Sequence, residues 1–183
     1  MALSLNAQSK GYEKSIEVFG GPGLDKLTKY QIGISMINGY RINYYFYAGV
    51  GTGFCYQESR YYLSYGPGDT YDDDSRTTRY IIPLYARIKA NLTKTSVSPF
   101  FIADIGGNID VGMVEYKNIQ GFFIEPQFGI DFDLTDPISL YIAIGANMAQ
   151  AKYMVFDFYH SGNGGEDRKG LASSLVFHLG IKF

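Results

Sequence analysis

The last eleven residues of the chain, SSLVFHLGIKF, alternate between apolar side chains and mostly polar ones. Apolar residues occupy every odd-numbered position from Leu175 to Phe183, while Ser174, His178 and Lys182 are among the residues between them. A period of two places the two sets on opposite faces of a β-strand. The segment is therefore predicted to be a strand whose apolar face contacts a protein core, a partner or lipid.

The same alternation recurs along the chain and predicts about eight strands. It is clearest over residues 122–134, where every even-numbered residue is apolar and the odd-numbered ones include three acids and a glutamine. Related patterns cover residues 16–18, 32–36, 46–54, 80–88, 101–105, 140–148 and 175–183. Most of these segments approach the roughly 9 to 11 residues that a tilted strand needs to cross a bilayer.

Short and long connections alternate between the predicted strands. Residues 38–42, 91–98 and 135–137 form short links, whereas GGPGLDKLTK, SRYYLSYGPGDTYDDDSR, DVGMVEYKNIQ and KYMVFDFYHSGNGGEDRKG are longer. Such sorting places the long loops at one end of a barrel, and the short turns and both termini at the other. The predicted fold class is all-β, a single eight-stranded antiparallel up-and-down barrel.

The apolar faces of such a barrel can point inward or outward. In a soluble lipocalin-like carrier they would surround a ligand, and in a transmembrane barrel they would contact lipid. Several glycines fall on the polar face, as a narrow interior requires: Gly49, Gly51, Gly53, Gly106, Gly129, Gly145 and Gly180. Tyrosines stand at the ends of the apolar faces, as interfacial girdles do: Tyr30, Tyr44, Tyr56 and Tyr80. Both observations favour the transmembrane barrel.

Composition excludes several other classes of protein. The formal net charge of -2 provides no basic surplus for nucleic-acid binding, and the single cysteine, Cys55, cannot form an internal disulfide. No run of roughly 18 apolar residues is present, so a membrane location requires a barrel. Pro83 and Pro126 fall inside predicted strands. Because proline removes a ladder donor, we expect a bulge or a strand end near each.

Two internal stretches and the terminal segment resemble a known family. YIIPLYARIKANL is followed by SPFFIADIGGNI, and the alternating last segment ends on an aromatic residue. From Tyr12 to Phe183 the chain resembles the small outer-membrane β-barrels of Gram-negative bacteria, OmpX-like or PorT-like proteins of the porin family. The resemblance implies a location in the bacterial outer membrane, with short periplasmic turns and longer extracellular loops. It also implies a C-terminal insertion signal formed by Phe177, Leu179, Ile181 and Phe183.

The chain is predicted to contain one domain. Residues 12–183 form the barrel, and residues 1–11 form a residual signal-peptide or flexible N-terminal segment. Leu5-Asn6-Ala7 within that segment resembles the end of a secretory signal, where a small residue precedes the cleavage point.

Turning the apolar faces outward places ten titratable side chains inside the barrel. They are Glu17, Arg79, Arg87, Lys89, Asp104, Glu125, Asp131, Asp133, His178 and Lys182. Charges in a narrow lumen must be paired or solvated, because an isolated buried ion is costly. Eight strands leave space for side chains and little else. We therefore expect a salt-bridged polar network that plugs the lumen, with a conducting pathway as the alternative.

No catalytic residue, cofactor or metal is predicted. The residue types of an acyl-transfer site occur in one glycine-rich loop, as His160, Ser161, Glu166 and Asp167. Glycine, serine and aspartate are also common in loops for reasons of turn geometry. The acids at 69 and 72–74 lack the alternating spacing of a calcium loop. Cys55 has no partner at metal-site spacing, and we expect it to fill a small space inside the barrel.

The predicted function is that of a non-catalytic integral outer-membrane barrel. It would act as a structural or accessory subunit of a larger outer-membrane assembly, through its loops or its lipid-facing surface. The expected partners are outer-membrane lipid including lipopolysaccharide, the outer-membrane assembly machinery, and other outer-membrane proteins. A lipid-modifying outer-membrane enzyme and a soluble lipocalin-like carrier are the alternatives.

Overall fold

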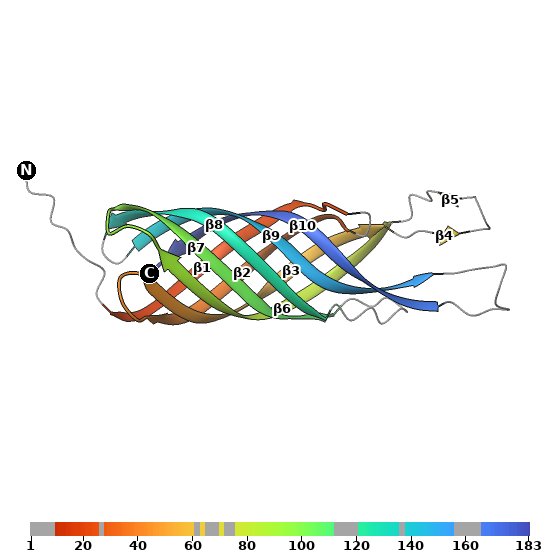
Figure 1. The fold of residues 1–183 in the computed structure, drawn as a ribbon, viewed down its shortest axis with the longest axis horizontal. Coiled ribbons are helices and arrows are strands. Elements are labelled where there is room, and N and C mark those ends of the chain that lie inside the picture. The colour runs from red at the N-terminus through yellow and green to blue at the C-terminus, as the bar shows by residue number, and fades with distance from the viewer. Residues whose placement is uncertain are drawn as a thin grey trace, which may run out of the picture.

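The computed structural model describes residues 10–25, 28–60, 63–64, 70–71, 76–111, 121–135, 138–155 and 166–183. Within these ranges, eight long strands close into an antiparallel barrel in the order β1-β10-β9-β8-β7-β6-β3-β2 (Figure 1). They are β1 (Gly11–Pro22), β2 (Thr28–Arg41), β3 (Phe46–Arg60), β6 (Arg76–Asn91), β7 (Val97–Asp110), β8 (Phe122–Thr135), β9 (Ile138–Val155) and β10 (Glu166–Lys182). The two-residue strands β4 (Leu63–Ser64) and β5 (Thr70–Tyr71) pair with each other. The predicted eight-stranded up-and-down barrel is confirmed.

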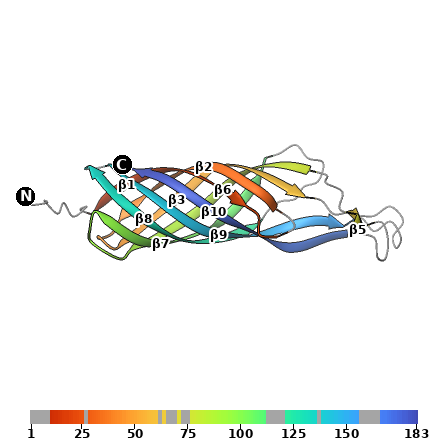
Figure 2. The ribbon, with the colours of Figure 1, turned by 90° about the horizontal axis from the view of Figure 1, so that it is seen from above.

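The connections are sorted between the two ends of the barrel. Residues 42–45 and 92–96 join strands at one end, where the C-terminus also lies (Figure 2). At the opposite end β9 and β10 extend past the other strands. β1 ends at Pro22 and β2 begins at Thr28, so these strands take up part of the predicted GGPGLDKLTK link.

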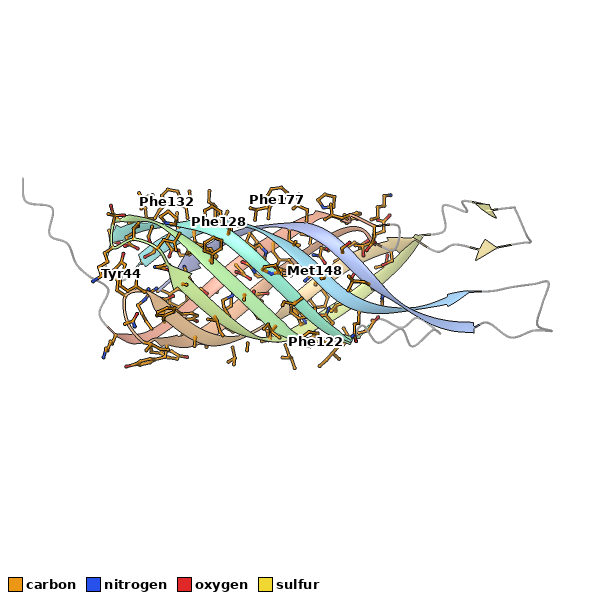
Figure 3. The ribbon with its side chains drawn as sticks, in the orientation of Figure 1. Tyr44, Phe122, Phe128, Phe132, Met148 and Phe177 are labelled. Atoms are coloured by element: carbon orange, nitrogen blue, oxygen red, sulfur yellow. The ribbon has the colours of Figure 1, made fainter. Side chains whose placement is uncertain are left out.

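Apolar side chains cover the outside of the barrel. Along β10, Phe177 and Leu179 are exposed, whereas Val176 and His178 between them are buried. The other barrel strands also carry exposed apolar residues, and Figure 3 shows Phe128 and Phe177 projecting outward from their strands. A soluble carrier would expose its polar face instead. A closed barrel with an apolar belt on its outside has the form of a membrane-spanning barrel.

The described residues contain no helix that is long and apolar enough to cross a membrane.

Glycines make room for large side chains inside the barrel. A Cβ atom built on Gly51 would overlap the ring of Tyr85, and one built on Gly180 would overlap the ring of Tyr141. Both tyrosines are buried, with Tyr141 only 2% exposed. The glycine-rich polar face of the sequence therefore corresponds to the crowded interior, where small and large residues alternate.

The two prolines lie within regular strands, and the predicted bulges or strand ends are absent there. Pro83 pairs with Asn108 of β7, and on its other side the ladder to β3 skips two residue pairs and resumes in the same register. Pro126 likewise pairs with Ala103 of β7, while the ladder to β9 is interrupted without a shift. Each proline lacks a donor toward one neighbour only, so the strand continues through it. That prediction is wrong.

Candidate functional site in the barrel lumen

A guanidinium group at the middle of the lumen holds two carboxylates. Arg87 of β6 donates to both oxygens of Glu17 on β1, with Nη–Oε distances of 2.9 Å. It also donates from Nε to Asp104 Oδ1 at 2.8 Å and from Nη2 to Oδ2 at 2.6 Å. Asp104 is the register partner of Arg87 on the neighbouring strand, whereas Glu17 lies three strands away in the other direction. The planar fork of arginine suits this double bidentate arrangement.

Two tyrosine hydroxyls complete the surroundings of Glu17. The Tyr141 hydroxyl of β9 donates to Glu17 Oε2 at 2.5 Å, and the Tyr85 hydroxyl lies 3.5 Å from Oε1. All three side chains are buried. Glu17 is thus bound from β6 and β9, and the three strands are joined through the interior.

A third buried carboxylate, Glu125 of β8, is held by amides and a histidine. The Gln127 amide nitrogen donates to Glu125 Oε1 at 2.9 Å and to Asp104 Oδ2 at 2.8 Å. The Asn147 amide donates to Glu125 Oε2 at 2.7 Å. His178 Nε2 of β10 lies 2.8 Å from Glu125 Oε1, within ion-pair distance, although neither ring nitrogen is aligned for a hydrogen bond. We refer to Glu17, Arg87, Asp104 and Glu125 together as the central layer.

A second charged group lies nearer the short connections. Lys89 Nζ contacts both oxygens of Asp131, at 2.8 and 2.6 Å, and Lys182 Nζ lies 3.0 Å from Asp131 Oδ2. All three side chains are buried. Lys89 Nζ also lies 3.8 Å from the centre of the Phe100 ring and 5.3 Å from that of Tyr141. We name these three charged residues the lysine layer. Tyr141 contacts both layers, because its ring lies near Lys89 and its hydroxyl bonds to Glu17.

Further ion pairs lie toward each end of the lumen. Arg41 Nε donates to Glu13 Oε2 at 3.0 Å near the short connections. Arg79 donates to Asp110 Oδ2 from Nε at 2.9 Å and from Nη2 at 2.7 Å near the opposite end. Polar contacts therefore follow one another along the interior from one end of the barrel to the other.

Most of the side chains predicted to lie in the lumen are buried there. Nine are: Glu17, Arg79, Arg87, Lys89, Asp104, Glu125, Asp131, His178 and Lys182. Seven of these form the central and lysine layers, and His178 contacts the central layer. Arg79 pairs with Asp110 nearer one end of the barrel. Asp133 differs: it is exposed at the end of β8 and accepts a hydrogen bond from Ser139 at 2.8 Å.

Sequence reasoning missed the uncharged members of the network and two of the ion pairs. Tyr141, Gln127 and Asn147 occupy odd-numbered positions on polar faces, but the predicted lumen set contains only acids, bases and a histidine. The two ion pairs that were not predicted join Arg41 to Glu13 and Arg79 to Asp110. Arg79 belongs to the predicted lumen set, but its partner Asp110 does not. The whole network is found by taking every residue on the inward-facing alternate positions that can form a hydrogen bond, whether or not it is charged.

The other candidates of the sequence fall in different places. His160, Ser161 and the acids at 69 and 72–74 lie outside the described residues. Cys55 is buried on the inward face of β3. Among the described residues, no group of three or more histidines, cysteines or acids is arranged to hold a metal ion.

The residues of the predicted insertion signal lie on the outside of β10. Phe177, Leu179, Ile181 and Phe183 are exposed, and β10 pairs with β1 from Ser15 to Gly20. The backbones of Lys14 and Phe183 exchange two hydrogen bonds, of 3.0 and 2.9 Å. These four residues thus lie on the outer face of the chain segment that closes the barrel.

The closed barrel with an apolar exterior and a polar interior has the fold of small outer-membrane β-barrels. Neisserial surface protein A shares the fold with a TM-score of 0.58 and 14% identity, over 96% of this chain and 98% of that one. The outer membrane protein AlkL, solved in lipid bilayers, also gives a TM-score of 0.58, with 11% identity over 100% of this chain and 93% of that one. No protein-family model and no curated protein sequence matches the chain. These structures confirm the predicted barrel fold.

Proposed function

We propose that this protein is a non-conducting, non-catalytic barrel of the bacterial outer membrane, and that it acts as a structural or accessory subunit of a larger assembly. In this role the lumen is a rigid filling. The protein would contact its partners, lipopolysaccharide and other outer-membrane proteins, through its outer connections and its lipid-facing belt. The outer-membrane assembly machinery would recognise the exposed apolar face of β10.

The observation that carries the proposal is the double bidentate contact of Arg87 with Glu17 and Asp104. It joins β1 to β6 and β7 across the interior, and all three side chains are buried. An ion crossing the lumen would have to separate these groups, and an unpaired buried charge costs several kcal/mol. The interior is therefore suited to stability rather than transport, which leaves the outer surfaces for function.

Extraction of the native membrane in mild detergent tests the assembly role. The tagged protein is purified, run on gels boiled and unboiled, and its co-purifying bands are identified. A heat-shifted band accompanied by partners in fixed ratio is the expected result. A heat-shifted band that purifies alone contradicts the subunit role, and a protein soluble without detergent contradicts the membrane barrel.

Conductance across planar bilayers tests the closed lumen separately. The purified protein is expected to give no steady single-channel steps. Regular steps that persist after repurification and are abolished by unfolding the protein would contradict the non-conducting role. Replacing Arg87 should not be used here, because that variant is expected to unfold.

A further inference from the structure

A cavity lies in the lumen between the central layer and the end where β9 and β10 extend. Its volume is about 50 Å³. Since a single water needs roughly 10 to 15 Å³ measured in this way, the cavity has room for about three or four water-sized groups. Glu17, Asp104, Glu125 and His178 line it on the side of the central layer. The cavity is therefore a polar space that the Arg87 contacts close off from the other end.

The charges beside this cavity do not balance. The central layer has three carboxylates, and its one guanidinium is shared by Glu17 and Asp104. Glu125 is contacted by the uncharged amides of Gln127 and Asn147 and by His178. In the part of the chain that the structure describes, no lysine or arginine contacts Glu125. Even with His178 protonated, the central layer and His178 together carry one negative charge more than they carry positive charge.

His178 lies between two carboxylates at the edge of the cavity. It is 5% exposed, and its ring nitrogens lie 3.6 Å from Glu17 Oε1 and 2.8 Å from Glu125 Oε1, although neither nitrogen is aligned for a hydrogen bond. Its ring stacks on Phe19, with the ring centres 5.8 Å apart, and Phe19 and Phe123 also line the cavity. A histidine shared by two carboxylates, a net excess of one negative charge and aromatic rings thus border one small space.

We propose that this cavity binds a small organic cation, namely a primary ammonium group on a molecule or fragment of about three or four non-hydrogen atoms. Glu125 supplies the counter-charge, and the rings of Phe19 and Phe123 supply surfaces on which a cation is stabilised. An ammonium group donates three hydrogen bonds and accepts none, which suits a carboxylate wall. The ligand enters from the side away from Arg87. This proposal does not depend on the assembly role of the protein.

The chain carries its own reporter for this cavity. Cys55 is the only cysteine in the sequence, and it lines the cavity. The full chain, folded in detergent, is treated with three small methanethiosulfonates that differ in charge: aminoethyl (cationic), sulfonatoethyl (anionic) and methyl (neutral). Each rate of Cys55 modification is divided by the rate for the same protein unfolded in denaturant. This removes the differences in intrinsic reactivity among the reagents.

The cationic reagent is expected to modify folded Cys55 at least about tenfold faster than the anionic one, because a cleft lined by one sign of charge concentrates counter-ions. Methylammonium chloride should slow modification by the neutral reagent, and sodium chloride at the same ionic strength should not. Equal rates for the cation and the anion overturn the proposal. So does a Cys55 that none of the reagents reaches, since the cavity would then be closed to ligands.

Two variants assign the effect to Glu125. Glu125→Gln should bring the ratio of cationic to anionic rates close to one and abolish protection by methylammonium. Glu13→Gln, which removes a lumen carboxylate paired with Arg41 and outside the cavity, should leave both unchanged. A heat-shifted band on unboiled gels shows that each variant is folded. If a variant does not fold, the wild-type modification rates alone test the proposal. Retention of the preference in Glu125→Gln would overturn the assignment.

Discussion

The central layer gathers carboxylates around one guanidinium, whereas the lysine layer gathers two ammonium groups around one carboxylate. In the first, Arg87 contacts Glu17 and Asp104 through three nitrogens. In the second, Asp131 accepts from Lys89 and Lys182. Each layer thus contains a single residue whose charge is opposite to that of the other members, Arg87 in the first and Asp131 in the second. The comparison teaches that the central member of a buried network matters more than the number of its ion pairs, which predicts a ranked series of substitutions.

The largest loss is expected for Arg87→Met. It leaves the buried carboxylates of Glu17 and Asp104 without the guanidinium that they share, and breaking a buried pair in this way costs about 3 to 5 kcal/mol for one uncompensated charge. We expect loss of the heat-shifted band, or a fall of at least that size in the free energy of unfolding by urea. Arg87→Lys keeps the charge without the fork and should lie between this variant and the wild type. An unfolding free energy within about 1 kcal/mol of wild type would refute the central role of Arg87.

Asp131→Asn should come next. It leaves the two lysines of the layer without their shared carboxylate, so a loss of about 3 kcal/mol is expected. The loss should be smaller than for Arg87→Met, because the flexible lysine stems allow their ammonium groups to move toward water. Adding Lys182→Met to this variant should recover part of the stability in the same urea titration. A double variant no more stable than the single one would show that lysine repulsion is not the cause.

Gly180→Ala tests the packing between the two layers. The added methyl group would overlap the Tyr141 ring, whose hydroxyl bonds to Glu17 and whose face lies near Lys89. Overpacking of this kind costs about 1 to 3 kcal/mol. Gly107→Ala is the matched control, since nothing lies within 4 Å of the position of its added Cβ. Equal unfolding free energies for the two variants would contradict the crowded interior.

The smallest effect is expected for Lys182→Met alone. Lys89 still contacts both oxygens of Asp131, so no buried charge is left unpaired. Replacing one member of a buried ionic group by an apolar side chain is often close to neutral, and a change of less than about 1 kcal/mol is expected in the urea midpoint analysis. A loss as large as that of Asp131→Asn would mean that both lysines are required, and the ranking of this layer would be wrong.

Much of this architecture follows from parity along each strand. Alternation over 175–183 and 122–134 places the apolar residues outside and residues such as Glu125 and His178 inside, as the structure has them. The alternation does not predict burial at strand ends. Asp133 is at an inward-facing position but is exposed, because it lies close to the end of β8. Which inward residues meet was not predictable in the same way. Contacts across the lumen depend on how far each strand is staggered, and a local pattern does not contain that information.

The pairing of Arg87 illustrates this limit. Its contact with Asp104 is a register pair of neighbouring strands, but its contact with Glu17 joins positions 70 residues apart on strands that do not touch. The prolines show the opposite case, in which a local rule was applied too strongly. A missing donor at Pro83 interrupts the ladder toward one neighbour, and the remaining ladder to β7 keeps the strand in register.

The pairing of Lys14 with Phe183 has a consequence for how the barrel is made. The free edge of β1 pairs with β10, which is the last strand of the sequence. The other seven barrel strands can therefore be in place while the edges of β1 and β9 still lack partners. Unpaired backbone groups are strongly disfavoured in hydrocarbon. Insertion should therefore finish in one concerted step that depends on β10, and a chain lacking it should accumulate as a surface-bound intermediate rather than as a smaller pore.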